Sequence, residues 1–131
     1  MKILILTIIA MFTITSMVTA QAIETITVKV GQQKTSKKSK LKIKFVSVVE
    51  DSRCPIGVNC VWAGNAKIKI EVTSRGLGKK VFEINTTMGP QGDQFDGWAI
   101  NLVALTPHPK ADTTLDPKDY RAKFSLTRLQ R

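Results

Sequence analysis

The sequence predicts an all-β domain built as a two-sheet antiparallel sandwich of six or seven strands. Apolar and polar residues alternate with a period of two in six segments, which is the pattern of strands that bury one face. No window of about a dozen residues places apolar residues along one face of a helix. Short strands separated by turn-forming residues fit two stacked sheets better than a barrel.

Six segments are expected to form these strands. In chain order they are 24–30, 40–49, 66–72, 81–84, 98–105 and 120–129. The alternation is sharpest in the second segment, where Leu41, Ile43 and Phe45 are expected to face the core and the lysines between them to face solvent. Gly76 and Gly78 supply turn geometry between the third and fourth segments.

Two long loops and one tyrosine refine the expected architecture. Residues 86–97 are rich in glycine and residues 106–119 contain three prolines, and loops of this length are uncommon unless they are functional or mobile. Asp116 lies four residues before Tyr120, which is the spacing of a tyrosine corner and favours an immunoglobulin-like arrangement. A plain turn followed by an amphipathic tyrosine explains the same residues equally well.

The N-terminal residues indicate export. Lys2 precedes a nearly unbroken apolar run, and small or compact residues follow up to Ala20, as in a cleavable secretory signal peptide. An uncleaved membrane anchor is the alternative, although such a span needs about 20 apolar residues. We therefore expect a signal peptide at 1–20 and a single domain at 21–131, located in the periplasm or secreted.

The two cysteines are expected to form one disulfide bond, Cys54–Cys60, because paired cysteines are typical of exported chains. The bridge would close a loop of seven residues, for which the loop-entropy estimate is about 2.4 kcal/mol of stabilisation. Since bridged sulfurs are not thiolates, neither cysteine is expected to act as a nucleophile or to bind a metal.

The residues around the bridge are expected to form a rigid structural clasp between two strands. The clasp comprises both cysteines together with Asp51, Arg53, Pro55, Trp62 and Gly64. Trp62 is expected to pack beside the bridge, and Pro55 and Gly64 to turn the chain. Arg53 is expected to pair with Asp51 or Glu50 at the surface, where such a pair contributes about 0–1 kcal/mol. The alternative is a recognition loop, 54–60, presented to a partner such as a protease, which binds well because it is already ordered.

The sequence offers little for catalysis, and no enzyme activity and no cofactor are predicted. His108 is the single histidine, it lies between two prolines, and no residue of its motif is suited to orient its ring as a general base. A hydrolase that uses the 106–119 loop is the disfavoured alternative. One histidine without a free thiol is too little for a zinc site.

Aspartates gather in both long loops. They are Asp93 and Asp96 in the first loop and Asp112, Asp116 and Asp119 in the second. Such groups could bind calcium, but neither spacing matches an EF-hand loop, and aspartates in turns commonly bond to their own backbone. No metal site is therefore predicted.

Basic residues supply the main hint of function. Without the signal peptide the chain carries 19 basic and 10 acidic residues, and this excess favours anionic partners. If the lysine-bearing strands are neighbours, their outer faces form a positive surface. Its residues are Lys40, Lys42, Lys44, Lys67, Lys69, Arg121 and Lys123. The expected ligands are anionic polysaccharides or lipid headgroups, and nucleic acid is not expected because no exposed aromatic residues alternate with the lysines. The alternative, which we favour, is that these lysines only keep a β surface from aggregating.

The segment from Asp51 to Gly64, DSRCPIGVNCVWAG, resembles a box found in small exported bacterial proteins, notably from Bacteroidetes-like organisms. The shared pattern is Asp-Ser-Arg-Cys-Pro followed by spaced Val, Cys, Trp and Gly, and the similarity covers most of 24–128. The resemblance implies an exported β-sandwich from a bacterium, and it implies no catalytic residue because the family has no assigned activity. Many of these proteins resemble lipoproteins, whereas this chain has no cysteine after the apolar run to accept a lipid.

Together these observations predict an exported, monomeric β-sandwich that is a non-catalytic binding or structural module. The lysine surface is its expected contact surface, and the loop between the cysteines is the alternative one. The identity of the ligand, the order of the strands, and the choice between periplasm and extracellular space are left open by the sequence alone.

Overall fold

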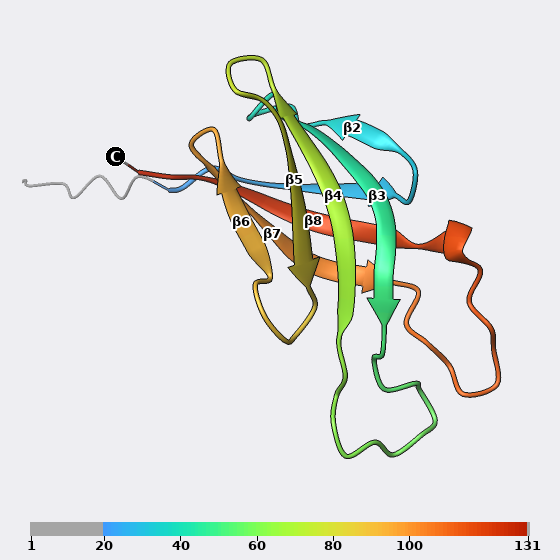
Figure 1. The fold of residues 1–131 in the computed structure, drawn as a ribbon. Coiled ribbons are helices and arrows are strands. Elements are labelled where there is room, and N and C mark those ends of the chain that lie inside the picture. The colour runs from blue at the N-terminus through green and yellow to red at the C-terminus, as the bar shows by residue number, and fades with distance from the viewer. Residues whose placement is uncertain (1–19, 131) are drawn as a thin grey trace, which may run out of the picture.

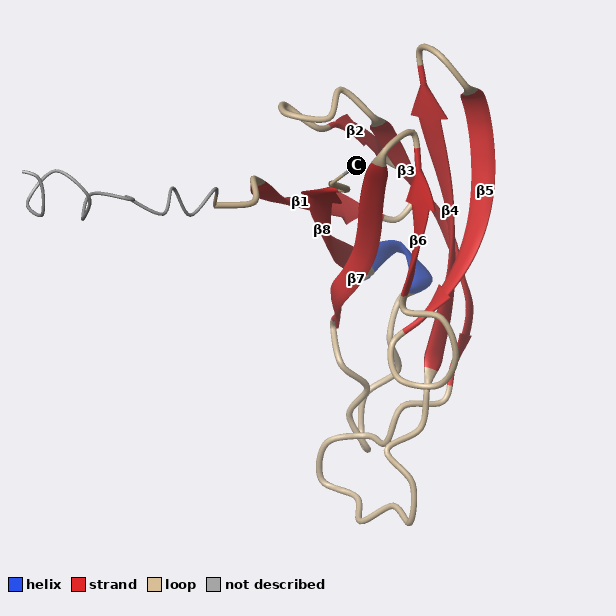
Figure 2. Ribbon diagram, turned by 90° about the vertical axis from the view of Figure 1, so that its left-hand side faces the viewer, coloured by secondary structure: helices blue, strands red, loops and turns tan. Residues whose placement is uncertain are grey.

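The computed structural model describes residues 20–130, which form two antiparallel four-stranded sheets stacked face to face (Figure 1; Figure 2). The strands are β1 (Ile23–Lys29), β2 (Gln33–Thr35), β3 (Lys42–Asp51), β4 (Ala66–Ser74), β5 (Gly78–Asn85), β6 (Gly92–Phe95), β7 (Trp98–Thr106) and β8 (Arg121–Arg128). A short 3-10 helix, η1 (Pro117–Asp119), precedes β8. The expected signal peptide, 1–20, lies outside the described residues apart from Ala20, and its cleavage stays a prediction.

The six strands expected from alternation are all present, and the prediction of an all-β, two-sheet fold is confirmed. The sheets contain two further strands, β2 and β6. Both are too short for a periodicity to be visible, since they have three and four residues, and every residue of β2 is exposed. β3 begins two residues later than expected, because Lys40 adopts a left-handed conformation with a φ of 62° in the preceding turn.

The strand order within the sheets is β1-β8-β7-β6 and β2-β3-β4-β5. Except for β1, each strand pairs with one that is adjacent in the chain, whereas an immunoglobulin sandwich uses Greek-key connections. The tyrosine corner does not form either. The Tyr120 hydroxyl donates to Asp51, and Asp116 instead caps η1 by accepting from the backbone N–H of Lys118. The expected immunoglobulin-like arrangement is therefore not the one that these strands adopt.

The hydrophobic core lies between the sheets and receives the inward face of each. Phe45, Ile43 and Ile68 enter it from one sheet, and Phe124 and Leu126 enter it from the other, all with less than 2% of their surface exposed. Burial of a side chain of this kind contributes about 1.5–3 kcal/mol. The core therefore stabilises the two sheets against each other and leaves the loops at their ends free to carry other features.

Two β-bulges in β3 decide where the end of this strand points. The register of β3 with β4 shifts after Phe45 and again after Val48. Each bulge exchanges the faces on which the following side chains lie. After the second bulge, Asp51 lies opposite the fully buried Ala66. The last residue of the strand is thus a carboxylate on the inner face of the sheet, at the edge of the core.

Candidate functional site

A buried polar network joins the end of β3 to the end of β7 and the start of β8. The guanidinium of Arg53 donates to the two carboxylate oxygens of Asp51, from Nε at 2.8 Å and from Nη2 at 2.7 Å. It also donates to the carbonyl oxygens of Leu105 and Pro107, at 2.6 and 2.9 Å. The Tyr120 hydroxyl donates to Asp51 at 2.8 Å. The Arg53 and Asp51 side chains are only 7% and 9% exposed, so the expectation of a weak surface pair is wrong.

The network shifts the pKa values of its carboxyl and phenol groups in opposite directions. Burial alone would raise the pKa of Asp51, but the hydrogen bonds from Arg53 and Tyr120, with the charge of Arg53, outweigh burial and lower it. The pKa of Tyr120 is raised by burial and by its bond to the Asp51 carboxylate. Asp51 therefore stays ionised and Tyr120 stays protonated at neutral pH, which suits a structural tie.

A second carboxylate, Glu24 of β1, holds the turn that leads from β2 to β3. It accepts hydrogen bonds from the Ser36 hydroxyl at 2.6 Å and from the backbone N–H groups of Lys37 and Lys38 at 2.8 and 2.9 Å. Desolvation by burial opposes ionisation, but these bonds and the charge of Lys38 lower the pKa of Glu24. Like Asp51, Glu24 joins segments that belong to different sheets.

The domain is expected to lose stability in acid. Because the folded pKa values of Asp51 and Glu24 are lowered, their contribution is complete above the ordinary values of about 4 and is lost as the pH falls through the folded values. The raised pKa of Tyr120 acts in alkali, where its contribution is lost as the pH rises from about 10 through the folded value. Urea unfolding across this pH range should show a plateau at neutral pH and a decline on both sides. Tyr120→Phe should remove the alkaline decline caused by the phenol, and a flat acid limb would contradict the roles of the two carboxylates.

The predicted Cys54–Cys60 disulfide is present, with a Cα–Cα distance of 5.9 Å. The loop that it closes is supported by the 106–119 loop, and both extend from the same end of the sandwich (Figure 1). The Ile56 N–H donates to the Pro109 carbonyl at 2.9 Å, and the Ile56 carbonyl accepts from the Ala111 N–H at 3.2 Å. This contact is a parallel bridge between loops that are distant in the sequence. The long proline-containing loop therefore has a structural function beside the disulfide.

His108 takes part in the same loop contact. Its Nε2 lies 2.7 Å from the carbonyl oxygen of Cys54, so the ring donates from Nε2 to the first residue of the disulfide loop. The His108 side chain is exposed, and both sulfurs nearby are bridged. The geometry gives His108 a structural contact, and a hydrolytic role for its loop stays an untested alternative.

A third loop joins this end of the molecule through Asn65. The side-chain oxygen of Asn65 accepts from the backbone N–H groups of Thr87 and Met88, at 3.1 and 3.2 Å. The preceding residue, Gly64, has a φ of +73°, and a Cβ at this position would lie 1.9 Å from the carbonyl oxygen of Ser52. The turning role expected of Gly64 thus has a steric basis, because only glycine allows the two backbone segments to approach so closely.

The clasp residues differ from expectation in one respect. Pro55 forms the expected turn, in which its carbonyl accepts from the Val58 N–H at 3.3 Å. Trp62, by contrast, is 80% exposed and its neighbour Val61 is 91% exposed, so the expectation that Trp62 packs beside the bridge is wrong. The disulfide holds the loop, but the tryptophan points away into solvent.

These two residues are among the exposed apolar side chains on the loops at this end of the molecule, which we call the apolar tip. It consists of the exposed apolar side chains at this end of the molecule: Ile56, Val58, Val61, Trp62 and Met88. No charged residue occurs between Cys54 and Ala66. Sequence reasoning placed the tryptophan against the disulfide, although this run of thirteen residues without a charge was a visible signal of an unusual surface.

The lysines of β3 and β4 share the outer face of one sheet, as expected, but they do not form a purely positive surface. Glu71 is opposite Lys44 and Glu50 is opposite Lys67 in the register. Lys69 lies 3.9 Å from Glu83 across to β5. Three of the four lysines, Lys44, Lys67 and Lys69, therefore have a carboxylate as a neighbour, which reduces the attraction of this face for anions, whereas Lys42 lies opposite Thr73.

The remaining members of the expected basic surface lie elsewhere. Arg121 and Lys123 belong to β8, which is in the other sheet, and Lys40 is in the turn before β3. The single positive surface predicted from all seven residues does not exist. Alternation along a strand shows which side chains share a face, but it does not show which strands share a sheet.

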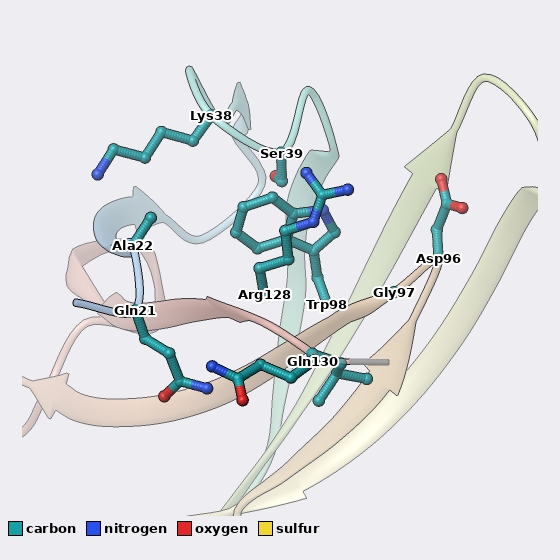
Figure 3. Close-up of a pocket in the computed structure, with 10 residues that line it drawn as sticks. Gln21, Ala22, Lys38, Ser39, Asp96, Gly97, Trp98, Arg128 and Gln130 are labelled. Atoms are coloured by element: carbon teal, nitrogen blue, oxygen red, sulfur yellow. The ribbon is translucent and has the colours of Figure 1, made fainter. Parts of the chain in front are cut away.

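The hollow drawn in Figure 3 lies at the opposite end of the sandwich and measures about 890 Å³. Trp98 and Arg128 are register partners across β7 and β8, and both line it. Lys38 and Asp96 also line it, and the Asp96 carboxylate accepts from the Ser74 hydroxyl. Its lining mixes both signs of charge and contains neither the histidine nor the cysteines, so the hollow suggests no particular reaction.

Within residues 20–130 no three metal-ligating side chains lie close enough together to hold an ion. In the same part of the chain no helix is long and apolar enough to cross a membrane. Comparison of the sequence and the structure with protein-family models, curated proteins and solved structures finds no match. The resemblance carried by the segment from Asp51 to Gly64 therefore rests on its residues alone, and the geometry of the site has to support any function.

Proposed function

We propose that this protein is an exported, non-catalytic binding module that contacts a partner protein through the apolar tip. The observation that carries the proposal is the exposure of Val61 and Trp62, at 91% and 80%, on a loop whose backbone is held in place. A soluble domain normally buries a tryptophan or presents it to a partner, because its large apolar surface is costly in water.

The support of the tip is what distinguishes it from a flexible loop. The disulfide closes the loop, and Ile56 bonds to the 106–119 loop through both its N–H and its carbonyl. The Asn65 side chain holds the neighbouring loop at Thr87. The Arg53 side chain, at the base of the loop, donates to Asp51, to the carbonyl of Leu105 in β7 and to the carbonyl of Pro107 just after β7. A surface that is already ordered loses less conformational entropy on binding, and tryptophan is the residue type most enriched among energetically dominant interface residues.

The charges beside the tip favour a protein partner over a lipid surface. The supporting loop carries exposed acidic residues at Asp112, Asp116 and Asp119, against two exposed lysines at Lys110 and Lys118. Negative groups next to an apolar surface repel anionic headgroups. An apolar pocket in a protein would accept the Trp62 ring without this cost, and the indole N–H could donate to a group at its rim.

The protease-inhibitor alternative is less well supported by the same geometry. An inhibitory loop offers its backbone to the enzyme as an added strand. Here the N–H and the carbonyl of Ile56 already bond to Pro109 and Ala111. The two most exposed apolar residues, Val61 and Trp62, also lie outside the segment that the disulfide closes. The proposed partner therefore contacts the residues after the bridge.

A photoreactive amino acid placed at Trp62 in the full-length chain, expressed in the producing cells, tests the proposal. Irradiation should give one discrete adduct with a protein. The matched control is the same amino acid at Leu77, which is also apolar and 62% exposed but lies in the turn at the opposite end of the molecule. With the captured partner purified, Trp62→Ala should weaken binding roughly 30-fold, as expected for a dominant interface residue.

The stability of Trp62→Ala separates a contact role from a folding role. Because the side chain is exposed, the substitution should change the free energy of unfolding by less than about 0.5 kcal/mol. Adducts with lipid, equal adducts at both positions, or no protein adduct at Trp62 would each rule out the proposed mode of binding.

A further inference from the structure

A cationic hollow lies where β1 ends, and residues of β1, of β2 and of the start of β8 line it. Its volume is about 340 Å³, and its lining is entirely polar: Thr27, Lys29, Gln32, Lys34 and Arg121. Lys29 and Arg121 are register partners on neighbouring strands, so their side chains leave the sheet side by side. Lys34 approaches from β2, which belongs to the other sheet.

The cations of this hollow lack the acidic neighbours that accompany the lysines of β3 and β4. No ion pair to Lys29, Lys34 or Arg121 occurs within the described part of the chain. Lys123 pairs with Thr27 in the register and adds a further positive charge on the same face. These charges repel one another unless an anion lies between them, so an anion that enters the hollow relieves this repulsion.

The face beside the hollow is uncharged over the rest of its length. The outward residues of β1, β8 and β7 that follow carry no charge. Thr25, Ser125, Thr127, Ala99 and Asn101 are small or bear hydroxyl or amide groups, and Ile23 and Val103 are exposed apolar residues of the same strands. The nearest carboxylates along the chain are those of Glu24 in β1 and of Asp116 and Asp119 before β8. Glu24 bonds to the Ser36 hydroxyl and to the N–H groups of Lys37 and Lys38, and Asp116 caps η1 through the Lys118 N–H. A chain of sugar units with hydroxyl groups fits such a surface, since each unit can exchange hydrogen bonds with water for bonds with these side chains.

We infer that the hollow binds the carboxylate- or sulfate-bearing sugar units of an acidic polysaccharide. The lysines and the arginine would contact the anionic group, with Arg121 able to bind two of its oxygens at once. Thr27 and Gln32 would contact neighbouring hydroxyl groups, and the volume is at the lower end of sites that hold a small ligand. No apolar side chain lines the hollow, which disfavours a lipid, and no aromatic side chain lines it for a base to stack on.

A matched pair of triple variants of the full-length chain tests this site. In the first, Lys29→Gln, Lys34→Gln and Arg121→Gln remove the three cations of the hollow. In the second, Lys42→Gln, Lys44→Gln and Lys69→Gln remove the same charge from the outer face of β3 and β4. Binding to polygalacturonate, dextran sulfate and neutral dextran is measured by calorimetry at low and physiological salt, with inorganic phosphate as a competitor.

The hollow variant should bind the two acidic polymers at least about tenfold more weakly, since three charge contacts of up to about 1 kcal/mol each are lost. The control variant should lose less than about threefold, and neutral dextran should bind none of the proteins. If both variants lose the same affinity for the acidic polymers, net charge alone explains binding and the proposed site is wrong. If free phosphate competes at the same concentration as the acid groups on the polymer, the assignment to a polysaccharide is overturned. The assignment is also overturned if the protein binds anionic vesicles but not the polymers. This site is separate from the apolar tip, so either proposal can fail without the other.

Discussion

Replacing Arg53 with methionine should lower the free energy of unfolding by about 3–5 kcal/mol, the largest effect expected of any single side chain in this domain. The substitution keeps much of the side-chain volume but removes every donor that Arg53 directs at Asp51, Leu105 and Pro107. It leaves the Asp51 carboxylate with only 9% of its side chain exposed, and only the Tyr120 hydroxyl and the backbone N–H of residue 53 would still donate to it. A buried charge without its partner is costly because it has lost its hydration.

Urea unfolding at neutral pH measures this loss, and the pH dependence identifies its cause. In the wild type, Asp51 has a lowered pKa, so acid removes its contribution. In the Arg53→Met variant, burial is opposed only by the Tyr120 hydroxyl and the backbone N–H of residue 53, so the pKa of Asp51 should rise. Protonation of the carboxylate in mild acid should therefore recover part of the lost stability. Tyr120→Phe, which removes one hydrogen bond and leaves the ion pair, should cost only about 0.5–1.5 kcal/mol. If Arg53→Met lowers the free energy of unfolding by less than about 1 kcal/mol, the network contributes little to the stability of the fold.

Replacing Gly64 with alanine should be the second most damaging single change, at roughly 2–5 kcal/mol. The added methyl group would lie 1.9 Å from the carbonyl oxygen of Ser52, so two backbone segments would have to separate. Such overpacking costs about 1–3 kcal/mol, and the left-handed conformation of Gly64 adds about 1–2 kcal/mol for a residue with a Cβ. The separation would also disturb Asn65, whose backbone N–H and carbonyl both bond to Ser52.

Gly57 provides the matched control for this steric argument. It has a similar positive φ, +92°, but nothing lies within 4 Å of the position that a Cβ would take. Gly57→Ala should therefore show only the conformational cost of about 1–2 kcal/mol. Thermal unfolding of both variants, with the disulfide intact, compares them directly. If Gly57→Ala and Gly64→Ala are equally destabilised, the close approach of Gly64 to Ser52 contributes nothing.

The disulfide loop shows how far sequence reasoning reaches at a candidate site. The pairing of Cys54 with Cys60, the turn at Pro55 and the turn at Gly64 depend on residues close together in the chain, and they were predictable for that reason. Arg53 was expected at the surface but is buried, and Trp62 was expected to pack beside the bridge but is exposed. Arg53 is buried because Leu105 and Pro107, more than fifty positions later, offer carbonyl groups to it. Trp62 is 80% exposed, and apart from the uncharged run around it nothing in its neighbouring residues indicates this.

The basic residues also show which features the sequence predicts and which depend on the tertiary structure. The exposure of the lysines in β3 and β4 follows from alternation alone. Their neutralisation by Glu50, Glu71 and Glu83 follows from the register between strands. The cationic hollow needs Lys29, Lys34 and Arg121 to meet from three strands in two sheets. No pattern within a single segment carries that information.

By itself, the order of the amino acids determined the all-β class, the inward face of each long strand and the local disulfide. These properties follow from contacts between near neighbours in the chain and from the two-residue repeat of a pleated backbone. The tertiary structure decided the strand order, the bulges that turn Asp51 inward, the buried ion pair and the two candidate contact surfaces. Each of these depends on which segments lie side by side, and that choice is made by the packing of the whole core between the sheets.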